Sequence, residues 1–108
     1  MKVGIIRCQQ TEALCPGTGD FAAVEKKSGA FETLGDCTIV GFVSCGGCPG
    51  SKAIARAQAL MDRGAQAIAL ATCITKGNPD GFPCPNRDSI LQALRKKCKE
   101  VPVLEYTH

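Results

Sequence analysis

Eight cysteines stand out in this chain of 108 residues, and two of them form the tetrapeptide Cys45-Gly46-Gly47-Cys48. The two glycines let the backbone turn tightly, so that both sulfurs can face one ion or one cluster. An apolar, β-branched run precedes the tetrapeptide and a helical pattern follows it. The second thiol is therefore expected near a helix N-terminus, whose partial positive charge stabilises a thiolate or an anionic cluster.

The elements that must position these thiols follow from hydrophobic periodicity. Apolar, β-branched runs predict four strands, at Lys2–Arg7, Cys37–Ser44, Ala67–Thr72 and Val103–Tyr106. Amphipathic spacing predicts three helices between them, from about Phe21 to Lys27, from Ser51 to Arg63, and from Asp88 to about Lys99. The expected helix caps are Thr18 or Asp20, Ser51, and Asn86 or Asp88.

This alternation of strands and helices predicts one α/β domain over residues 1–108. The expected architecture is a three-layer fold with a four-stranded parallel sheet, of the flavodoxin/Rossmann-like β-α-β-α-β-α-β type. The first three predicted strands end at Cys8, Cys45 and Cys73, and the fourth leads to His108. Since all C-terminal strand ends of a parallel sheet share one edge, we expect a cysteine-rich rim there.

Not every cysteine belongs to that rim, because a thiol is also a small hydrophobic group that packs well in a core. Cys37 begins a strand at the opposite edge, and Cys98 lies on the apolar side of a helix, so both are expected in the core. The expected primary metal ligands are Cys8, Cys45, Cys48 and Cys73, and the expected secondary ligands are Cys15, Cys84 and His108.

The number and type of these ligands favour an iron–sulfur cluster over zinc. A structural zinc site closes with four ligands, and six rim cysteines with a histidine exceed that number. The Cys15-Pro16 and Cys84-Pro85 steps are similar to ferredoxin ligation. We expect electron transfer or small-molecule redox chemistry, with a redox protein or a small molecule as partner. Zinc binding is the alternative, and whether the protein is an enzyme stays open.

Composition narrows the remaining function classes. The net charge is +3, the basic residues cluster late on a predicted helix, and aromatics make up 5%, which disfavours nucleic-acid binding. The N-terminal segment does not resemble a signal peptide, and no apolar run approaches membrane-spanning length. We therefore expect a cytoplasmic protein, in a reducing compartment where cysteines bind metals or react in preference to forming disulfides.

The ordered motifs resemble the CGGC-domain family, which comprises small proteins found largely in anaerobic bacteria and archaea. The resemblance covers essentially the whole chain. It rests on Arg7-Cys8, Cys45-Gly46-Gly47-Cys48, Ala71-Thr72-Cys73-Ile74, Cys84-Pro85 and Thr107-His108. It implies metal binding through cysteines and histidines, and it implies no particular reaction.

Two positions depart from the family pattern. A histidine commonly stands four residues before the third-strand cysteine, where this chain has Ala69. The closing family motif reads Gly-Thr-His, whereas Tyr106 precedes Thr107 here. The first departure leaves His108 as the sole imidazole of the chain, which weakens a mixed cysteine–histidine zinc site.

Two other functions fit parts of the sequence. A strand, a Cys-x-x-Cys pair and a helix also occur in thiol–disulfide oxidoreductases of the thioredoxin type, and Pro102 before the last strand could stand for the proline of that fold. The additional rim thiols would interfere with dithiol exchange at Cys45 and Cys48, and the predicted sheet is all-parallel instead of mixed. Residues 17–22 fit a loose nucleotide-binding pattern, but they lie too far beyond the first strand.

Overall fold

The structure is a computed structural model that describes residues 1–77 and 84–108. Four strands in these residues form one sheet in the order β2-β1-β3-β4, and every neighbouring pair is parallel. The strands are β1 (Lys2–Arg7), β2 (Thr38–Ser44), β3 (Ala67–Leu70) and β4 (Val103–Leu104). The predicted α/β fold with a four-stranded parallel sheet is therefore confirmed.

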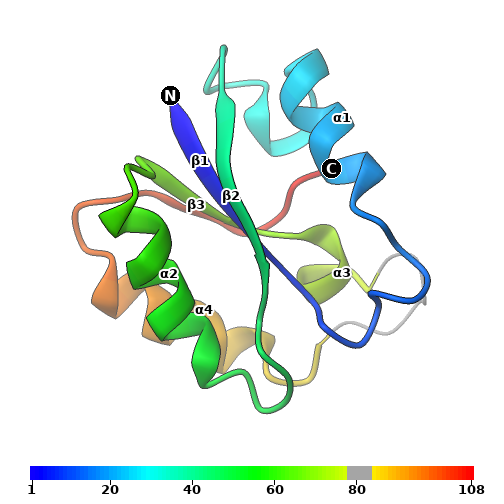
Figure 1. The fold of residues 1–108 in the computed structure, drawn as a ribbon, viewed down its shortest axis with the longest axis vertical. Helices are drawn as coiled ribbons and strands as arrows, with labels where there is room; N and C mark the ends of the chain where they lie inside the picture. Colours follow the sequence, from blue (N-terminus) through cyan, green and yellow to red (C-terminus); the bar gives the residue numbers. More distant parts are fainter. Residues whose placement is uncertain (78–83) are drawn as a thin grey trace.

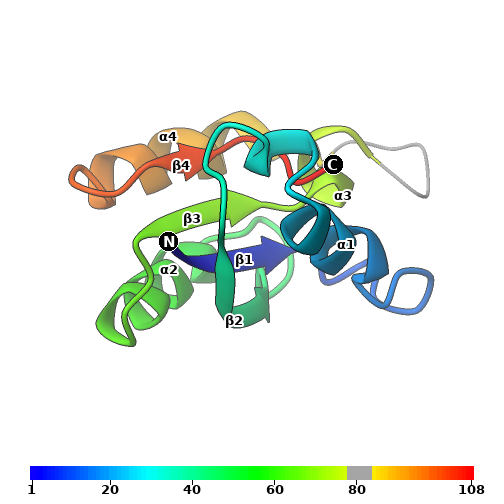
Figure 2. The same ribbon diagram turned by 90° about the horizontal axis from the view of Figure 1, so that it is seen from above.

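The helices cover both faces of this sheet (Figure 1). They are α1 (Thr18–Lys26), α2 (Lys52–Asp62), α3 (Thr72–Thr75) and α4 (Arg87–Lys97), with a 3₁₀ turn η1 (Gly29–Phe31). Figure 1 shows α1 on one side of the strands and the neighbouring helices α2 and α4 on the other, and Figure 2 shows α4 running beside β4. Right-handed crossovers explain this arrangement. The chain crosses the sheet in one direction from β1 to β2 and in the opposite direction from β2 to β3 and on to β4, so the connecting helices lie on opposite faces.

The core is aliphatic and is centred on β1 and β3. Val3, Ile5 and Ile68 are fully buried, whereas β2, at the sheet edge, is only half-buried along its length. Helix α2 packs closely against the strands because two of their residues are glycines. A Cβ atom at Gly4 would lie 2.7 Å from Cδ1 of Leu60, and one at Gly41 would also clash with Leu60.

The third strand is shorter than predicted. It ends at Leu70 and not at Thr72, and the chain then turns into α3, which carries Cys73. The reason is the length of β4, which pairs with β3 only through Ile68↔Val103 and Ala69↔Leu104. Pairing with β4 stops before Leu70, so the chain turns there, and Cys73 lies on a helical turn just past the sheet edge.

The predicted helix caps were also wrong in detail. Helix α1 starts three residues early, after Gly17 in the left-handed conformation (φ 85°), so that Thr18 and Asp20 lie inside its first turn. Ser51 and Asn86 do precede α2 and α4, but neither makes a side-chain capping hydrogen bond. β4 ends at Leu104, before Tyr106. Part of the predicted loop 75–87 lies outside the described residues.

None of the helices in the described ranges combines the length and the apolar character needed to cross a membrane.

Candidate functional site

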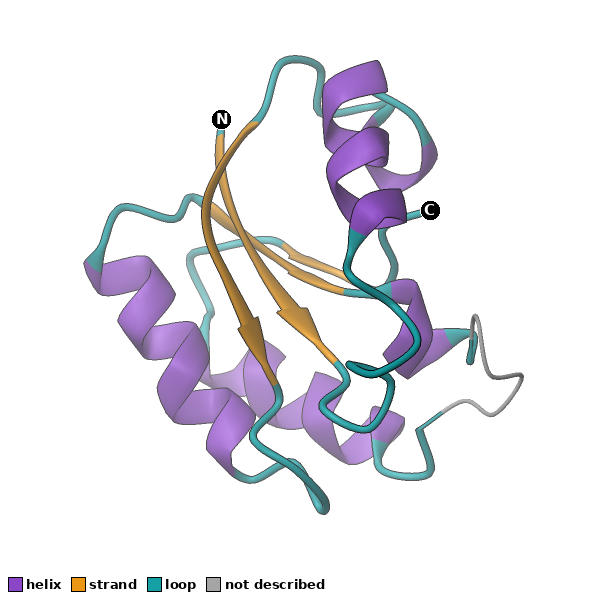
Figure 3. Ribbon diagram, turned by 45° about the vertical axis from the view of Figure 1, so that its right-hand side comes forward, coloured by secondary structure: helices purple, strands orange, loops and turns teal. Residues whose placement is uncertain are grey.

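The strand ends bring the predicted rim thiols to one edge of the molecule. Figure 3 shows the loops after β1 and β2 leaving the same edge of the sheet. The backbone N–H of Cys45 donates to the carbonyl of Arg7 (2.7 Å), and the N–H of Cys8 donates to Sγ of Cys73 (3.3 Å). The N–H of Cys84 donates to the carbonyl of Ile74 (2.8 Å). The loop thiol is thereby attached to the same edge as the strand-end thiols, and all eight cysteines are free.

Three other rim thiols lie near enough to Cys84 to affect the pKa of its thiol. Burial raises the pKa of the Cys84 thiol, and negative charge on Cys8, Cys48 and Cys45 raises this pKa further. The N–H of Asn86, 3.4 Å from the sulfur, acts in the opposite direction. The Cys84 thiol therefore lies near those of Cys8, Cys45 and Cys48. Within residues 1–77 and 84–108, no three Cys, His, Asp or Glu side chains already converge as ligands of one ion.

Cys73 lies between Cys8 and a pocket that Asp20 also lines. Its side chain is 6% exposed, and burial raises the pKa of its thiol. The N–H of Cys8 and the hydroxyl of Thr11 donate to this sulfur and lower the pKa, whereas negative charge on Cys8 and Asp20 raises it. Cys73 therefore joins the strand-end thiols to the pocket that contains Asp20.

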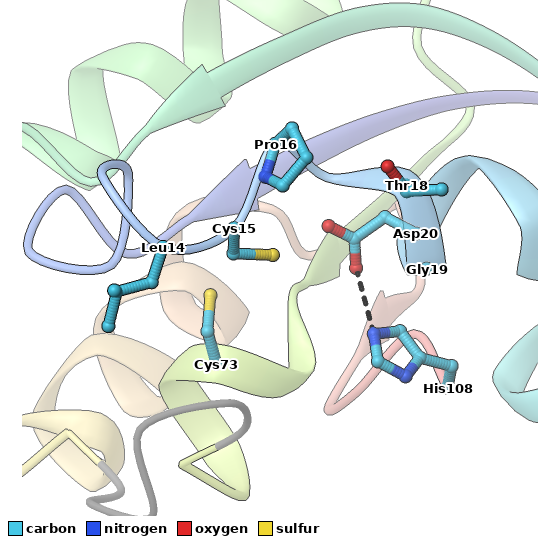
Figure 4. Close-up of a pocket in the computed structure, with 8 residues that line it drawn as sticks. All are labelled: Leu14, Cys15, Pro16, Thr18, Gly19, Asp20, Cys73 and His108. Atoms are coloured by element: carbon cyan, nitrogen blue, oxygen red, sulfur yellow. Dashed lines mark ion pairs between the residues drawn. The ribbon is translucent and has the colours of Figure 1, made fainter.

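That pocket has a volume of about 190 Å³ (Figure 4). It is lined by Leu14, Cys15, Pro16, Thr18, Gly19, Asp20, Cys73 and His108. Cys15 and Cys73 lie on one side of the pocket, and Asp20 and His108 face each other on the other side. The structure thus divides the seven predicted rim residues into two groups. Cys8, Cys45, Cys48 and Cys84 form one group, and Cys15, Cys73 and His108 line the pocket.

Asp20 is a residue of this pocket that sequence reasoning missed. It is 3% exposed, the hydroxyl of Thr107 donates a short hydrogen bond to its Oδ1, and Nε2 of His108 lies 3.7 Å from the same oxygen. From the sequence, Asp20 is expected as a helix cap. The sequence near Asp20 gives one sign of this role, its place in the first turn of a helix that follows a strand. Its partners, Thr107 and His108, lie at the other end of the sequence.

A threonine network fixes the backbone of residues 107 and 108 at the pocket. Oγ1 of Thr72 accepts hydrogen bonds from the N–H groups of Thr107 (3.2 Å) and His108 (2.9 Å) and donates to the carbonyl of His108 (3.0 Å). Thr72 and Thr107 are completely buried. A Cβ atom at Gly19 would lie 2.7 Å from Nε2 of His108, so a glycine at this position leaves room for the imidazole.

Arg7 adds a fixed positive charge at the end of β1. It is 7% exposed, its Nε donates to the carbonyl of Cys8 (3.4 Å), and its guanidinium lies 6.0 Å from the centre of the Phe42 ring. In the described part of the chain, its Nη2 is the one fully enclosed side-chain polar atom without a hydrogen-bond partner. Because a guanidinium stays protonated, this cation favours negative charge near it.

The two cysteines predicted to be core residues lie away from the rim. Cys98 ends helix α4 and is 3% exposed. Cys37 is half-buried and precedes the first residue of β2, at the opposite end of that strand from Cys45. Both positions agree with a packing role.

Comparison with known proteins gives a family but no described activity. The family model of the CGGC domain matches residues 2–108. The uncharacterized protein MJ0582 of Methanocaldococcus jannaschii is 41% identical over 116 residues, an alignment that covers all of this chain and 87% of that protein. No solved structure matches the chain.

Proposed function

Because the chain belongs to the CGGC-domain family, we propose that it is a metal-binding protein whose rim thiols hold an iron–sulfur cluster used for electron transfer. Family membership supports the coarser part of this proposal, a cysteine-rich protein suited to metal binding. The choice of cluster rests on this chain's own residues. The observation that carries it is the placement of these thiols at one edge of the sheet, where the N–H of Cys45 donates to the carbonyl of Arg7, next to Cys8, and the N–H of Cys84 donates to the carbonyl of Ile74.

The donor chemistry of these residues fits the cluster. Thiolates are soft ligands that select iron–sulfur clusters, zinc or copper(I), and four of them are the usual number for a cluster. The turn between Cys45 and Cys48 has both glycines in the left-handed region (φ 84° and 97°), which lets two thiols leave one short loop. The positive charge of Arg7 beside Cys8 favours a site whose net charge is negative.

The fourth thiolate ligand of the proposed cluster differs from the one expected from the sequence. The sequence alone favoured Cys73 beside Cys8, Cys45 and Cys48. Negative charge on those three raises the pKa of the Cys84 thiol, so Cys84 lies near them, whereas Cys73 accepts from the N–H of Cys8 and lines the pocket. We therefore assign the fourth thiolate to Cys84 in this proposal.

When bound, such a cluster supplies one-electron transfer. The residues around it would hold the thiols and tune their basicity. The N–H of Asn86 donates to Sγ of Cys84 (3.4 Å), and hydrogen bonds to ligand sulfur are one of the ways in which proteins set cluster potentials. Buried Ile74 and Ala71 exclude water from the side of the rim next to α3.

The test is anaerobic reconstitution with iron and sulfide, followed by visible and electron spin resonance spectra. We expect broad absorption near about 400 nm from thiolate–iron charge transfer. The Cys45→Ser/Cys48→Ser variant and Cys84→Ser should lose iron and colour. Cys37→Ser and Cys98→Ser, which remove thiols away from the rim, should retain both.

Three results would contradict this proposal. Stoichiometric zinc bound to four thiols, with no iron taken up, would replace the cluster by a zinc site. Colourless protein with a reversible Cys45–Cys48 disulfide would favour an oxidoreductase, although the all-parallel sheet differs from the mixed sheet of thioredoxins. Equal loss of iron in the rim variants and in the two control variants would remove the residue assignment.

A further inference from the structure

The carboxylate of Asp20 has one oxygen whose hydrogen-bonding capacity is unused. Oδ1 accepts from the Thr107 hydroxyl and lies near His108, but no described residue donates to Oδ2. Since Oδ2 is not among the fully enclosed atoms without partners, it retains accessible surface. In Figure 4 this oxygen points into the pocket, toward the side of Cys15 and Pro16.

A nearly buried carboxylate with an open oxygen favours a ligand that donates hydrogen bonds. An ionised carboxylate accepts at both oxygens, and burying it with only part of that capacity used is costly. The imidazole of His108, at 3.7 Å, is beyond hydrogen-bond distance of Oδ1 and leaves Oδ2 uncovered. The residue is also held rigidly, because Thr107 is itself fixed by Thr72.

From this geometry we propose that the pocket binds a small organic molecule with a primary ammonium group, which donates to Oδ2 of Asp20. The positive charge of the ammonium compensates the buried carboxylate, and its hydrogen bond to a charged acceptor is of the stronger kind. The site is separate from the proposed cluster ligands, so this proposal does not depend on the metal.

An organic ammonium suits this pocket better than a metal ion, because no three Cys, His, Asp or Glu side chains of the described residues converge on one point. Leu14 and Pro16 also line the pocket, and Leu14 is 66% exposed, so an aliphatic body can cover apolar surface there. A volume of about 190 Å³ admits a short carbon chain beside the ammonium group. A bound molecule would lie against the thiols of Cys15 and Cys73, which line the pocket opposite Asp20 and His108.

The first experiment is calorimetric titration of the full chain with n-propylammonium chloride at pH 7 and constant ionic strength. An alkylamine is protonated at this pH, as a lysine side chain is. We expect a dissociation constant on the order of millimolar, in keeping with a ligand of so few atoms. Tetramethylammonium carries the charge without N–H donors, and it should not bind measurably.

Variants connect the binding to the pocket. Asp20→Asn should weaken n-propylammonium binding about tenfold or more, because it removes the charged acceptor. Asp36→Asn is the matched control, since Asp36 is an exposed acid that pairs with Lys27 and does not line the pocket. If Asp20→Asn does not fold, Cys15→Leu is an independent test. The larger, half-buried side chain should occupy part of the pocket and weaken n-propylammonium binding, while the Asp20–Thr107 bond stays in place.

A second readout locates the ligand without a variant. At saturation, n-propylammonium should slow the alkylation of Cys15 by iodoacetamide several-fold and leave the rate at exposed Cys48 unchanged, as measured by mass spectrometry. The proposal is overturned by absence of heat and protection up to about 100 mM ligand, by equal binding of tetramethylammonium, or by unchanged affinity in Asp20→Asn.

Discussion

At the scale of single residues, burial separates the chemical reactivity of the cysteines. Cys98 is 3% exposed, and burial raises the pKa of its thiol, although the nearby Lys97 charge lowers it in part. Cys48 lies in the exposed turn before α2. Because the thiolate is the nucleophile, a raised pKa leaves less of the reactive form at neutral pH.

We therefore expect iodoacetamide to modify Cys48 first and Cys98 last in the folded protein at pH 7. The rate at Cys98 should rise by about tenfold for each pH unit until its raised pKa is reached, since the thiolate fraction grows in that proportion. Peptide-resolved mass spectrometry measures both rates, and unfolding in urea should make them similar. Equal rates in the folded protein at pH 7 would contradict the burial of Cys98.

Asp20 shows why part of the site was not predictable from sequence. A carboxylate in the first turn of a helix has a local explanation, which is favourable interaction with the helix dipole. Its actual partner, Thr107, is 87 positions away. Only the assembled sheet brings α1 next to the segment after β4, so no local pattern contains this pairing. The cysteines were predictable because their type alone limits their chemistry.

At the scale of elements, two glycines decide how closely helix α2 approaches the sheet. Gly4 on β1 and Gly41 on β2 are paired in register, and Leu60 of α2 occupies the space above both. The turn from Cys45 to Cys48 connects β2 to α2, so this packing also fixes the start of the helix that follows the thiols. A side chain at either glycine would push the helix outward.

Gly4→Ala should therefore lower the free energy of unfolding by about 1–3 kcal/mol through overpacking against Leu60. The penalty should largely vanish in the Leu60→Ala background, where the methyl group has room. Urea denaturation of the four proteins in this cycle gives the coupling energy directly. Additive effects of the two substitutions would show that Leu60 does not set the approach.

The elements that follow a strong periodicity were predicted well, and those set by neighbours were not. β1 and β2 start within a residue of prediction, and α2 ends within one, because their apolar spacing is determined by the sequence itself. The end of β3 depends on how far β4 extends alongside it, which its own residues do not encode. Helix α3 was missed for that reason, since Ala71-Thr72-Cys73-Ile74 continues an apolar run that looks extended.

At the scale of the whole molecule, the proposed cluster site connects segments that are far apart in the chain. Its ligands follow β1 and β2 and come from the loop before α4. Metal bound only by the folded protein should therefore stabilise it globally, by about 4 kcal/mol at a free metal concentration one thousand times the dissociation constant. For a domain of this size, that corresponds to an increase in Tm of roughly 15 °C or more.

Calorimetry before and after chelation measures this difference. The Cys45→Ser/Cys48→Ser variant should melt at the same temperature with and without the metal, whereas Cys37→Ser should show the full increase. Metal-independent melting of the unmodified protein would contradict a site that joins these segments.

The central position of β1 also affects the order of events while the protein is being made. A ribosome releases β1 first, yet this strand needs both β2 and β3 as neighbours, and Cys84 emerges only after β3. For most of translation the early thiols of Cys8, Cys45 and Cys48 therefore exist without their fourth partner. With the ligands proposed above, a nascent chain would bind a metal through the Cys45–Cys48 turn alone and would complete the site only after Cys84 emerges. Assembly of the proposed cluster would then follow release of most of the chain, and the early thiols would have to stay reduced until that point.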